Sequence, residues 1–209
     1  MRIGRRAWLQ AVALLLASRR VRAEPGDDEV LARIARARAI VRTIRGPFTQ
    51  VRTIGLLATD VRSRGTLALV RPDRLRWMLD PPDDMTFWMG PEGLAYRGPH
   101  GEGRMPTTTV RVAAALDDMR TLLGGDLSRL RERWVLRVVT DNAAGVELEA
   151  LARSAAPGSV RGMRFSLARD LVRPTHVLLV EGAHDRTTID FGELDVNSVI
   201  DDAWMRPPS

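Results

Sequence analysis

The sequence has 209 residues, of which 44% are hydrophobic, enough for one domain with a sizeable core. It contains no cysteine, which excludes a disulfide framework, thiol chemistry and cysteine metal sites. The formal net charge of +6 belongs to the first 23 residues, which hold six arginines and no acidic residue. The other 26 basic residues balance the 26 acidic ones, and this balance argues against nucleic acid as a partner of the remaining chain.

Residues 1–23 have the features of a secretory signal peptide. Three arginines precede a short apolar run at residues 11–17, which is too short to span a bilayer, and a small-residue cleavage site ends at Ala23. Arg5-Arg6 followed by Trp8-Leu9 resembles a twin-arginine signal, and the general secretory route is the alternative. We therefore expect export and a mature domain of residues 24–209.

Helical spacing of apolar residues predicts three helices. In the first, at residues 25–44, the apolar positions are Val30, Ile34, Ala37, Val41 and Ile44. Packing on a core explains this stripe, and attachment to a membrane surface is the alternative. A second helix is expected at residues 110–123, and a third, capped by Asp126, at residues 127–133.

Alternating apolar residues between turn signals predict about ten or eleven antiparallel strands. They are expected at residues 48–52, 60–70, 74–79, 85–89, 94–96, 134–140, 145–151, 160–168, 174–181 and 186–194. The glycine-rich stretch at 98–103 is expected to be a loop, and the tail after 194 to be mostly loop, with Trp204 as a plug. The pattern predicts an α+β fold, a curved sheet or half-barrel with helices on one side.

One face of the predicted sheet collects apolar side chains rich in methionine and aromatic residues, which suit an adaptable lining. With two positions of the second helix, the candidate cavity residues are Leu67, Leu69, Leu75, Trp77, Met85, Phe87, Met89, Leu116, Met119, Leu136, Met163, Phe165, Leu167 and Phe191. The pattern alone does not separate a closed core from a cavity.

The stretch at residues 65–82 contains one residue that does not fit an apolar face. Arg71 shares the parity of Leu67 and Leu69, and Pro72 ends the strand directly after it. A guanidinium in an apolar interior is costly unless it is paired or hydrogen-bonded. Either Arg71 reaches water from the strand end, or it points inward and is held by partners.

The sequence offers no support for catalysis. The three histidines, at positions 100, 176 and 184, are scattered, with no two at metal-ligand spacing on one helix. Glu147 and Glu149 share an outward face, which is typical of a solvated strand and not of an acid–base pair. We expect no enzyme activity, no bound metal and no cofactor.

Several of these features together resemble the LolA family of outer-membrane lipoprotein carrier proteins. The specific part is Phe48-Thr49-Gln50 followed by Gly65, Leu67, Arg71-Pro72, Trp77 and Pro81, and Leu94-Ala95-Tyr96, Met163-Arg164-Phe165 and the strand at 188–191 support it. The resemblance covers nearly the whole mature chain. It implies an incomplete antiparallel β-barrel of about 11 strands, covered by helices that form a lid over an apolar cavity.

The resemblance also implies a function. The protein would be a periplasmic monomer that takes a lipoprotein from an inner-membrane ABC releasing complex, shields its acyl chains and passes it to an outer-membrane receptor. Arg71 would donate hydrogen bonds to a lid within residues 110–133 and hold the empty state closed. A carrier for another lipid or glycolipid, and a regulator that senses lipoproteins on the same fold, are the alternatives.

Overall fold

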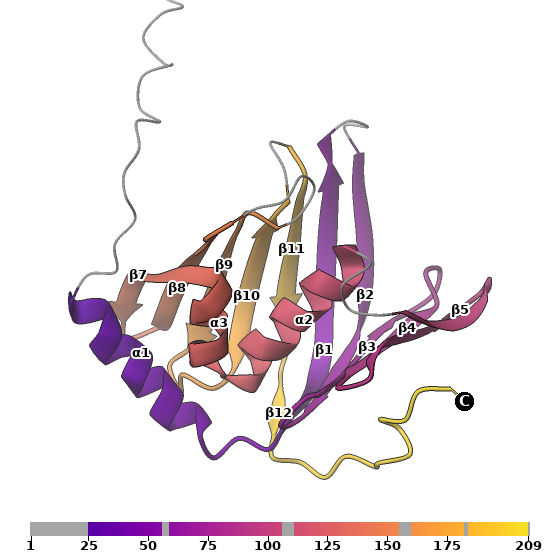
Figure 1. Ribbon diagram of the computed structural model, residues 1–209, viewed down its shortest axis with the longest axis horizontal. Coiled ribbons are helices and arrows are strands. Elements are labelled where there is room, and N and C mark those ends of the chain that lie inside the picture. The colour runs from indigo at the N-terminus through magenta and orange to yellow at the C-terminus, as the bar shows by residue number, and fades with distance from the viewer. Residues whose placement is uncertain (1–24, 56–58, 106–110, 155–159, 182–183, 209) are drawn as a thin grey trace, which may run out of the picture.

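The computed structural model describes residues 25–55, 59–105, 111–154, 160–181 and 184–208, so the expected signal peptide lies outside the described residues. One strongly curved antiparallel sheet forms the body of the molecule, and helices cross its concave face (Figure 1). This arrangement is the α+β half-barrel that the sequence predicts.

The sheet follows the chain closely. Its strands are β1 (Thr43–Ile54), β2 (Thr59–Val70), β3 (Arg74–Leu79), β4 (Met85–Gly90), β5 (Gly93–Gly98), β6 (Gly101–Met105), β7 (Trp134–Asn142), β8 (Gly145–Ala152), β9 (Gly162–Ala168), β10 (Pro174–Val180), β11 (Arg186–Phe191) and β12 (Asp195–Val196). The order is β6-β5-β4-β3-β2-β1-β11-β10-β9-β8-β7, and the short β12 pairs with β1. Because the described edge strands β6 and β7 do not pair with each other, the barrel is incomplete.

Within the described residues, three helices cover the sheet: α1 (Pro25–Arg38), α2 (Arg111–Gly124) and α3 (Leu127–Arg133). Helices α2 and α3 cross the concave face, and α1 lies along one end of the barrel (Figure 1). The side chain of Asp126 caps α3 by accepting from Arg129 N at 3.0 Å, as predicted. Arg33 of α1 donates two bonds of 3.0 Å to Asp141 of β7, which fixes α1 against that edge strand.

The first helix is shorter than the sequence predicted. It ends at Arg38, and Val41 and Ile44 are buried outside it, in the connection and at the start of β1. From Thr43 the chain pairs with β2, and the buried positions then alternate with exposed ones, as at Ile44 and Phe48. The apolar residues spaced three and four apart therefore belong in turn to a helix, to the connection after it and to the inner face of a strand.

The glycine-rich stretch at 98–103 is not a loop. It forms the hairpin of β5 and β6, with Gly101 at φ +126°, a backbone conformation that favours glycine. The ring of Tyr96 lies over Gly103, where an added Cβ would be 2.9 Å from the Tyr96 hydroxyl. Because glycine is depleted in strands, residue propensities did not predict β6. In the structure the Tyr96 ring fills the space that a side chain at Gly103 would occupy.

The buried core lines the concave face of the sheet. Phe48 and Trp77 pack with ring centroids 3.9 Å apart, beneath the lid helix α2. Gly65 makes room for this pair, because an added Cβ would lie 1.8 Å from the carbonyl oxygen of Met78 and 3.0 Å from the Phe48 ring. The phenylalanine, glycine and tryptophan that carried the family resemblance thus meet at one point of the core.

The C-terminal segment runs along the outer face of the sheet. The Trp204 ring lies 4.0 Å from the Arg76 guanidinium and 4.8 Å from that of Arg45, both on outward positions of their strands. Trp88 is buried beneath the same segment and donates to Trp204 O at 3.5 Å. The prediction that Trp204 plugs the barrel is therefore wrong: it covers the barrel from outside.

Candidate functional site

A cavity of about 230 Å³ lies between the concave face and α2. Its apolar lining is Trp77, Leu79, Phe87, Leu116, Met119, Leu179 and Ile189, and its polar lining is Gln50, Arg52, Glu181 and Thr187. Pockets for small molecules commonly enclose ~300–1,000 Å³. The cavity is therefore small for a lipid in this state, and a larger one requires α2 to move.

The candidate cavity residues divide into two groups. Trp77, Phe87, Leu116 and Met119 line the cavity. Leu67, Leu69, Leu75, Met89, Leu136, Met163, Phe165 and Leu167 lie in the buried core, Phe191 packs against that core, and Met85 is half-buried beside Gly98. The interior of the closed barrel is thus filled largely by its own side chains. Those side chains would line an accessible cavity only if α2 moved away from the barrel.

Helix α2 presents an apolar underside to this interior. Leu116, Met119, Leu122 and Leu123 are all buried, and two of them line the cavity. Burying a side chain of this size contributes ~1.5–3 kcal/mol, so the underside alone holds α2 on the barrel strongly. Acyl chains would bury the same side chains equally well, and they can therefore compete with the barrel for this face.

The C-terminal end of α2 leaves carbonyl oxygens that need partners. Gly125, at φ +74°, reverses the chain, so Gly125 N donates to Leu122 O at 3.1 Å and Asp126 N donates to Thr121 O at 3.3 Å. Arg38, the last residue of α1, supplies the remaining donors. Its Nη1 donates to Leu122 O at 2.8 Å and its Nη2 to Leu123 O at 2.6 Å.

Arg38 is 1% exposed, which is unusual for an arginine. Its charge lies at the negative end of the α2 dipole, which favours the contact. Burial, together with the smaller effect of repulsion by Arg71, lowers the pKa of Arg38 to about 10. The guanidinium therefore stays charged at neutral pH, and closing α2 over it both desolvates a charge and makes two hydrogen bonds.

Arg71 holds a different helix end from the one expected. Its Nη1 donates to Arg38 O at 2.8 Å and to Val41 O at 3.2 Å, at the end of α1. The reason is its place in the sheet: β2 ends beside the start of β1, and Arg71 N donates to Arg42 O at 2.9 Å. The expected bonds to the lid carbonyls are made by Arg38. We call Arg38 and Arg71 the arginine pair, because Arg71 binds the end of α1, and Arg38 is the residue at that end.

Arg38 was missed because four arginines, at 33, 36, 38 and 42, surround the apolar stripe of the predicted helix. If the helix continued to Ile44, Arg38 would be one of several solvated arginines on its polar side. The signal that it differs is its position at the true helix end, three residues before the buried Val41.

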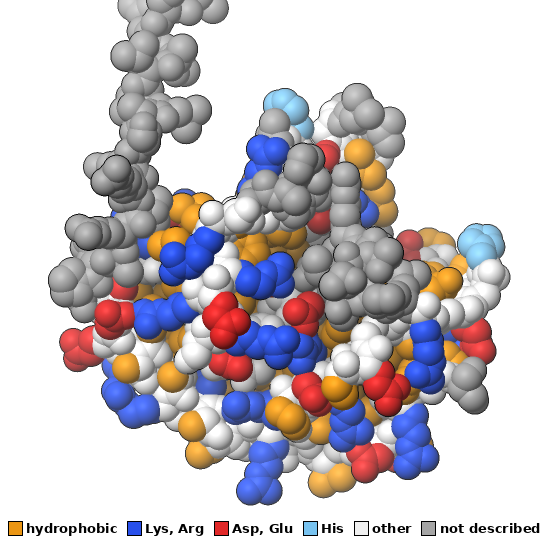
Figure 2. All heavy atoms as spheres, in the orientation of Figure 1, with side chains coloured by type: hydrophobic (Ala, Val, Ile, Leu, Met, Phe, Trp, Pro, Cys, Tyr) orange, Lys and Arg blue, Asp and Glu red, His pale blue; other side chains and the backbone are white. Residues whose placement is uncertain are grey.

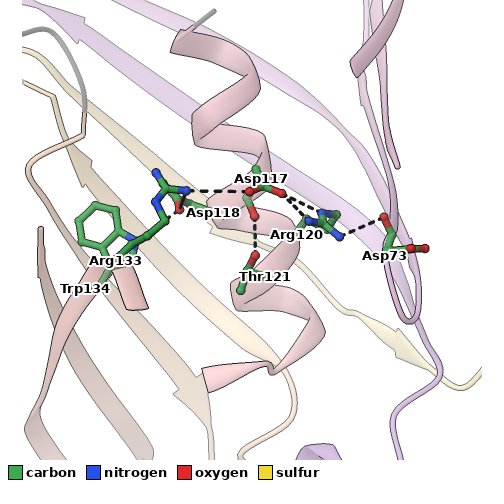
Figure 3. Close-up of polar contacts among 7 residues, drawn as sticks. All are labelled: Asp73, Asp117, Asp118, Arg120, Thr121, Arg133 and Trp134. Carbon is green, nitrogen blue, oxygen red and sulfur yellow. Dashed lines mark hydrogen bonds and ion pairs between the residues drawn. The ribbon is translucent and has the colours of Figure 1, made fainter. Parts of the chain in front are cut away.

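Polar contacts also attach α2 along its length (Figure 3). Asp118 is buried, 2.9 Å from Arg133 Nη1 and 3.3 Å from the Trp134 Nε1 that donates to it. Burial raises the pKa of Asp118 from 3.8 to about 6, against the opposing effects of Arg133 and Trp134. Opening α2 would expose Asp118 and return its pKa towards 3.8. The closed state therefore gains stability over the open one as the pH falls from about 6 to about 4.

On another side of α2, Arg120 reaches the β2–β3 turn. It is buried, pairs with Asp117 in the same helix, and its Nη1 donates to Asp73 O at 3.4 Å (Figure 3). Thr121 Oγ1 donates to Asp117 O at 2.8 Å. Helix α2 is thus an apolar cover attached by charged groups at several points, and each of these groups would regain water when the helix moves away.

The face that carries the helices has a mixed charge. Basic and acidic side chains are interspersed across it, without a broad basic area among the described residues in this view (Figure 2). Pairs such as Arg33 with Asp141 and Arg133 with Asp118 account for part of this pattern. The described part of the chain contains no helix long and apolar enough to cross a membrane.

Residues 39–206 match the family described as outer membrane lipoprotein carrier protein LolA. The chain belongs to the LolA family. Its fold recurs in a solved structure of MucB, with a TM-score of 0.54, 16% identity, and coverage of 89% of this chain and 64% of MucB. It recurs also in a DUF1329 family protein from Desulfovibrio piger, with a TM-score of 0.52, 9% identity, and coverage of 85% of this chain and 95% of that one. It also matches a chain in the structure of the MucA/MucB complex of Pseudomonas aeruginosa, with a TM-score of 0.51, 16% identity, and coverage of 86% of this chain and 60% of that one.

This LolA-family chain spans less than two thirds of the MucB chain that it matches. Identities of 9–16% show a common fold and leave the ligand of each protein open. No curated protein sequence gives a significant match.

Proposed function

We propose that this LolA-family protein is a carrier that shields the acyl chains of lipoproteins inside its half-barrel. The observation that carries the proposal is the closed lid: α2 covers a small apolar cavity, and the buried Arg38 binds its end. A structural core has no need to bury an arginine charge beneath a helix end. In a lid that opens and closes, such a charge is hydrogen-bonded to the helix end when the lid is closed and hydrated when it is open, so neither state is strongly disfavoured.

The physical chemistry of transport fits this arrangement. Each methylene group removed from water contributes ~0.8 kcal/mol, so long acyl chains cannot cross an aqueous compartment unshielded. Delivery requires the opposite property, because a carrier that binds too tightly never releases its cargo. The closed state competes with cargo for the underside of α2 and so weakens the binding by the free energy of closing.

The signal-like residues 1–23 place the carrier in the periplasm in this proposal. An inner-membrane ABC releasing complex would load it and an outer-membrane receptor would unload it, with the protein acting as a monomer, without cofactor and without catalysing a reaction. A regulator that binds a protein partner is a second candidate, favoured by the likeness to MucB, which was solved in complex with MucA.

The test is the identity of the ligand. The full chain would be expressed with its signal, purified from the periplasm, and its bound molecules identified by mass spectrometry. An apolar fluorescent probe would then be displaced with a diacylated lipopeptide. Co-purified acyl compounds and saturable displacement support the carrier. A ligand-free protein that binds neither probe nor lipopeptide, in all preparations, contradicts it.

A further inference from the structure

The cavity beneath α2 has a polar rim of four side chains, Gln50, Arg52, Glu181 and Thr187. Gln50 and Arg52 are alternate residues of β1 and therefore share one face. Arg52 pairs in register with Thr187 of β11, and Glu181 directly follows β10, the next strand. Three neighbouring strand segments thus bring the four side chains together at one end of the cavity.

The concave face changes from apolar to polar at the position of these four side chains. Deeper along β1, the residue that shares this face is Phe48, which is buried, and deeper along β11 it is Ile189, also buried. Towards the open end, Phe48 is followed by Gln50 and Arg52, and Ile189 gives way to Thr187. The cavity is therefore apolar inside and polar at one end, and an amphipathic ligand has one favourable orientation in it. Its acyl chains lie inside and its head group lies against the polar rim.

The charges of the polar rim indicate which head group it suits. Arg52 Nη2 lies 3.9 Å from Glu181 Oε2, and the two side chains are 49% and 18% exposed. The opposite charges leave the four residues with no net charge. Arg52, Gln50 and Thr187 offer donors to carbonyl oxygens, and Glu181 accepts from N–H or O–H groups. A phosphate would be attracted by Arg52 but repelled by Glu181.

We propose that the polar rim binds the uncharged ester and amide groups of an acylated head, and that Glu181 disfavours anionic phospholipids. The proposal rests on the carrier function and adds the chemistry of its cargo. Acylated peptides and diacylglycerols share this chemistry, and the experiment separates them.

The experiment measures displacement of an apolar fluorescent probe from the full chain by three ligands with identical short acyl chains. These are dioctanoylglycerol, a dioctanoylglyceryl-cysteine peptide with an acetylated N-terminus, an amidated C-terminus and no charged side chains, and dioctanoylphosphatidylglycerol. The wild type is expected to bind the peptide most tightly, since it alone adds an amide, and the anionic lipid about tenfold more weakly than the glycerol. Glu181→Gln is expected to remove the preference against the anionic lipid. Arg52→Gln and Thr187→Val are expected to weaken the two neutral ligands by roughly three- to tenfold.

Arg62→Gln is the matched control, because Arg62 is exposed on the neighbouring strand and pairs with Asp60 outside the cavity. It is expected to leave all three affinities unchanged. Equal binding of the three ligands by the wild type and by every variant overturns the polar rim while leaving the carrier intact. A wild type that prefers the anionic lipid also overturns it. Failure of all three ligands to displace the probe overturns the carrier function itself.

Discussion

Replacing Arg38 by methionine is expected to release the lid helix and to strengthen binding of acyl ligands. Methionine keeps the unbranched, apolar stem that packs beside Gly125, and it removes both donors to α2. Leu122 O keeps the bond from Gly125 N, while Leu123 O loses the bond from Nη2. The closed state of the variant therefore buries a carbonyl that the open state exposes to water.

The size of the effect follows from three contributions. Two hydrogen bonds from a charged donor contribute ~3–6 kcal/mol to the closed state. The lowering of the pKa of Arg38 to about 10, caused by burial first and by repulsion from Arg71 second, corresponds to a cost of roughly 3 kcal/mol that the variant no longer has. A buried carbonyl without a partner costs ~1–3 kcal/mol. These contributions sum to about 1–6 kcal/mol in favour of the open state, and we expect an effect in the lower half of that range, roughly ten- to a hundredfold.

The assay is displacement of an apolar fluorescent probe by dioctanoylglycerol, measured together with release of a labelled lipoprotein to acceptor membranes. Arg38→Met should bind the lipid roughly ten- to a hundredfold more tightly and release the lipoprotein correspondingly more slowly. Arg36→Met, at an exposed position of the same last helical turn, is the matched control and should behave as the wild type. Arg38→Lys keeps the charge without the two-donor fork and should fall between them.

Unchanged affinity and release in Arg38→Met, in a protein that keeps its circular dichroism spectrum, would refute this reasoning. Arg38 would then be a structural contact between two helices that do not separate during function.

Three further outcomes are expected. Arg71→Leu should strengthen lipid binding by roughly three- to tenfold, which is less than the effect of Arg38→Met, because it frees only the end of α1. An effect larger than that of Arg38→Met would contradict the inference that Arg71 acts on the lid only through Arg38. Lipid binding by the wild type should weaken between pH 7 and pH 4.5, and Asp118→Asn should remove that part of the pH dependence; identical titrations of the two proteins would exclude Asp118 as its source. Trp204→Ala should lower the free energy of unfolding by ~1–3 kcal/mol in urea melts without changing lipid affinity, while Val199→Ala, at an exposed site, should change neither.

The sequence predicted those parts of the fold that depend on short-range patterns. Leu75, Trp77 and Leu79 alternate cleanly, and β3 has the predicted bounds; Asp126 caps α3 as expected. The end of α1 was mispredicted because Val41 and Ile44 continue a helical spacing by chance, although the first lies in a turn and the second in a strand. Local spacing does not reveal which strand a backbone segment pairs with, and here Ile44 pairs with Leu69 of β2.

The site depends even more on contacts between distant segments. Arg71 was singled out correctly as an arginine on an apolar parity, but its acceptors belong to residues 38 and 41. No local sequence feature distinguishes Arg38, because its acceptors lie 84 and 85 positions away in the sequence. Those carbonyl groups are free to accept only because α2 ends at them. Similarly, alternation identified the inward side chains, whereas only the placement of α2 decides which of them face a cavity and which fill the core.

The central claim is that α2 leaves the barrel when acyl chains enter. The chain has no cysteine, so two introduced cysteines can carry spin labels at defined places. Suitable positions are Gly124 at the end of α2, where an added Cβ meets no atom within 4 Å, and Thr49, exposed on the outer face of β1. Distances between the labels would be measured by electron paramagnetic resonance with and without a saturating diacylated lipopeptide. The account predicts a shift to longer distances on loading, and the same shift in Arg38→Met without ligand. An unchanged distance distribution in the loaded protein would contradict it.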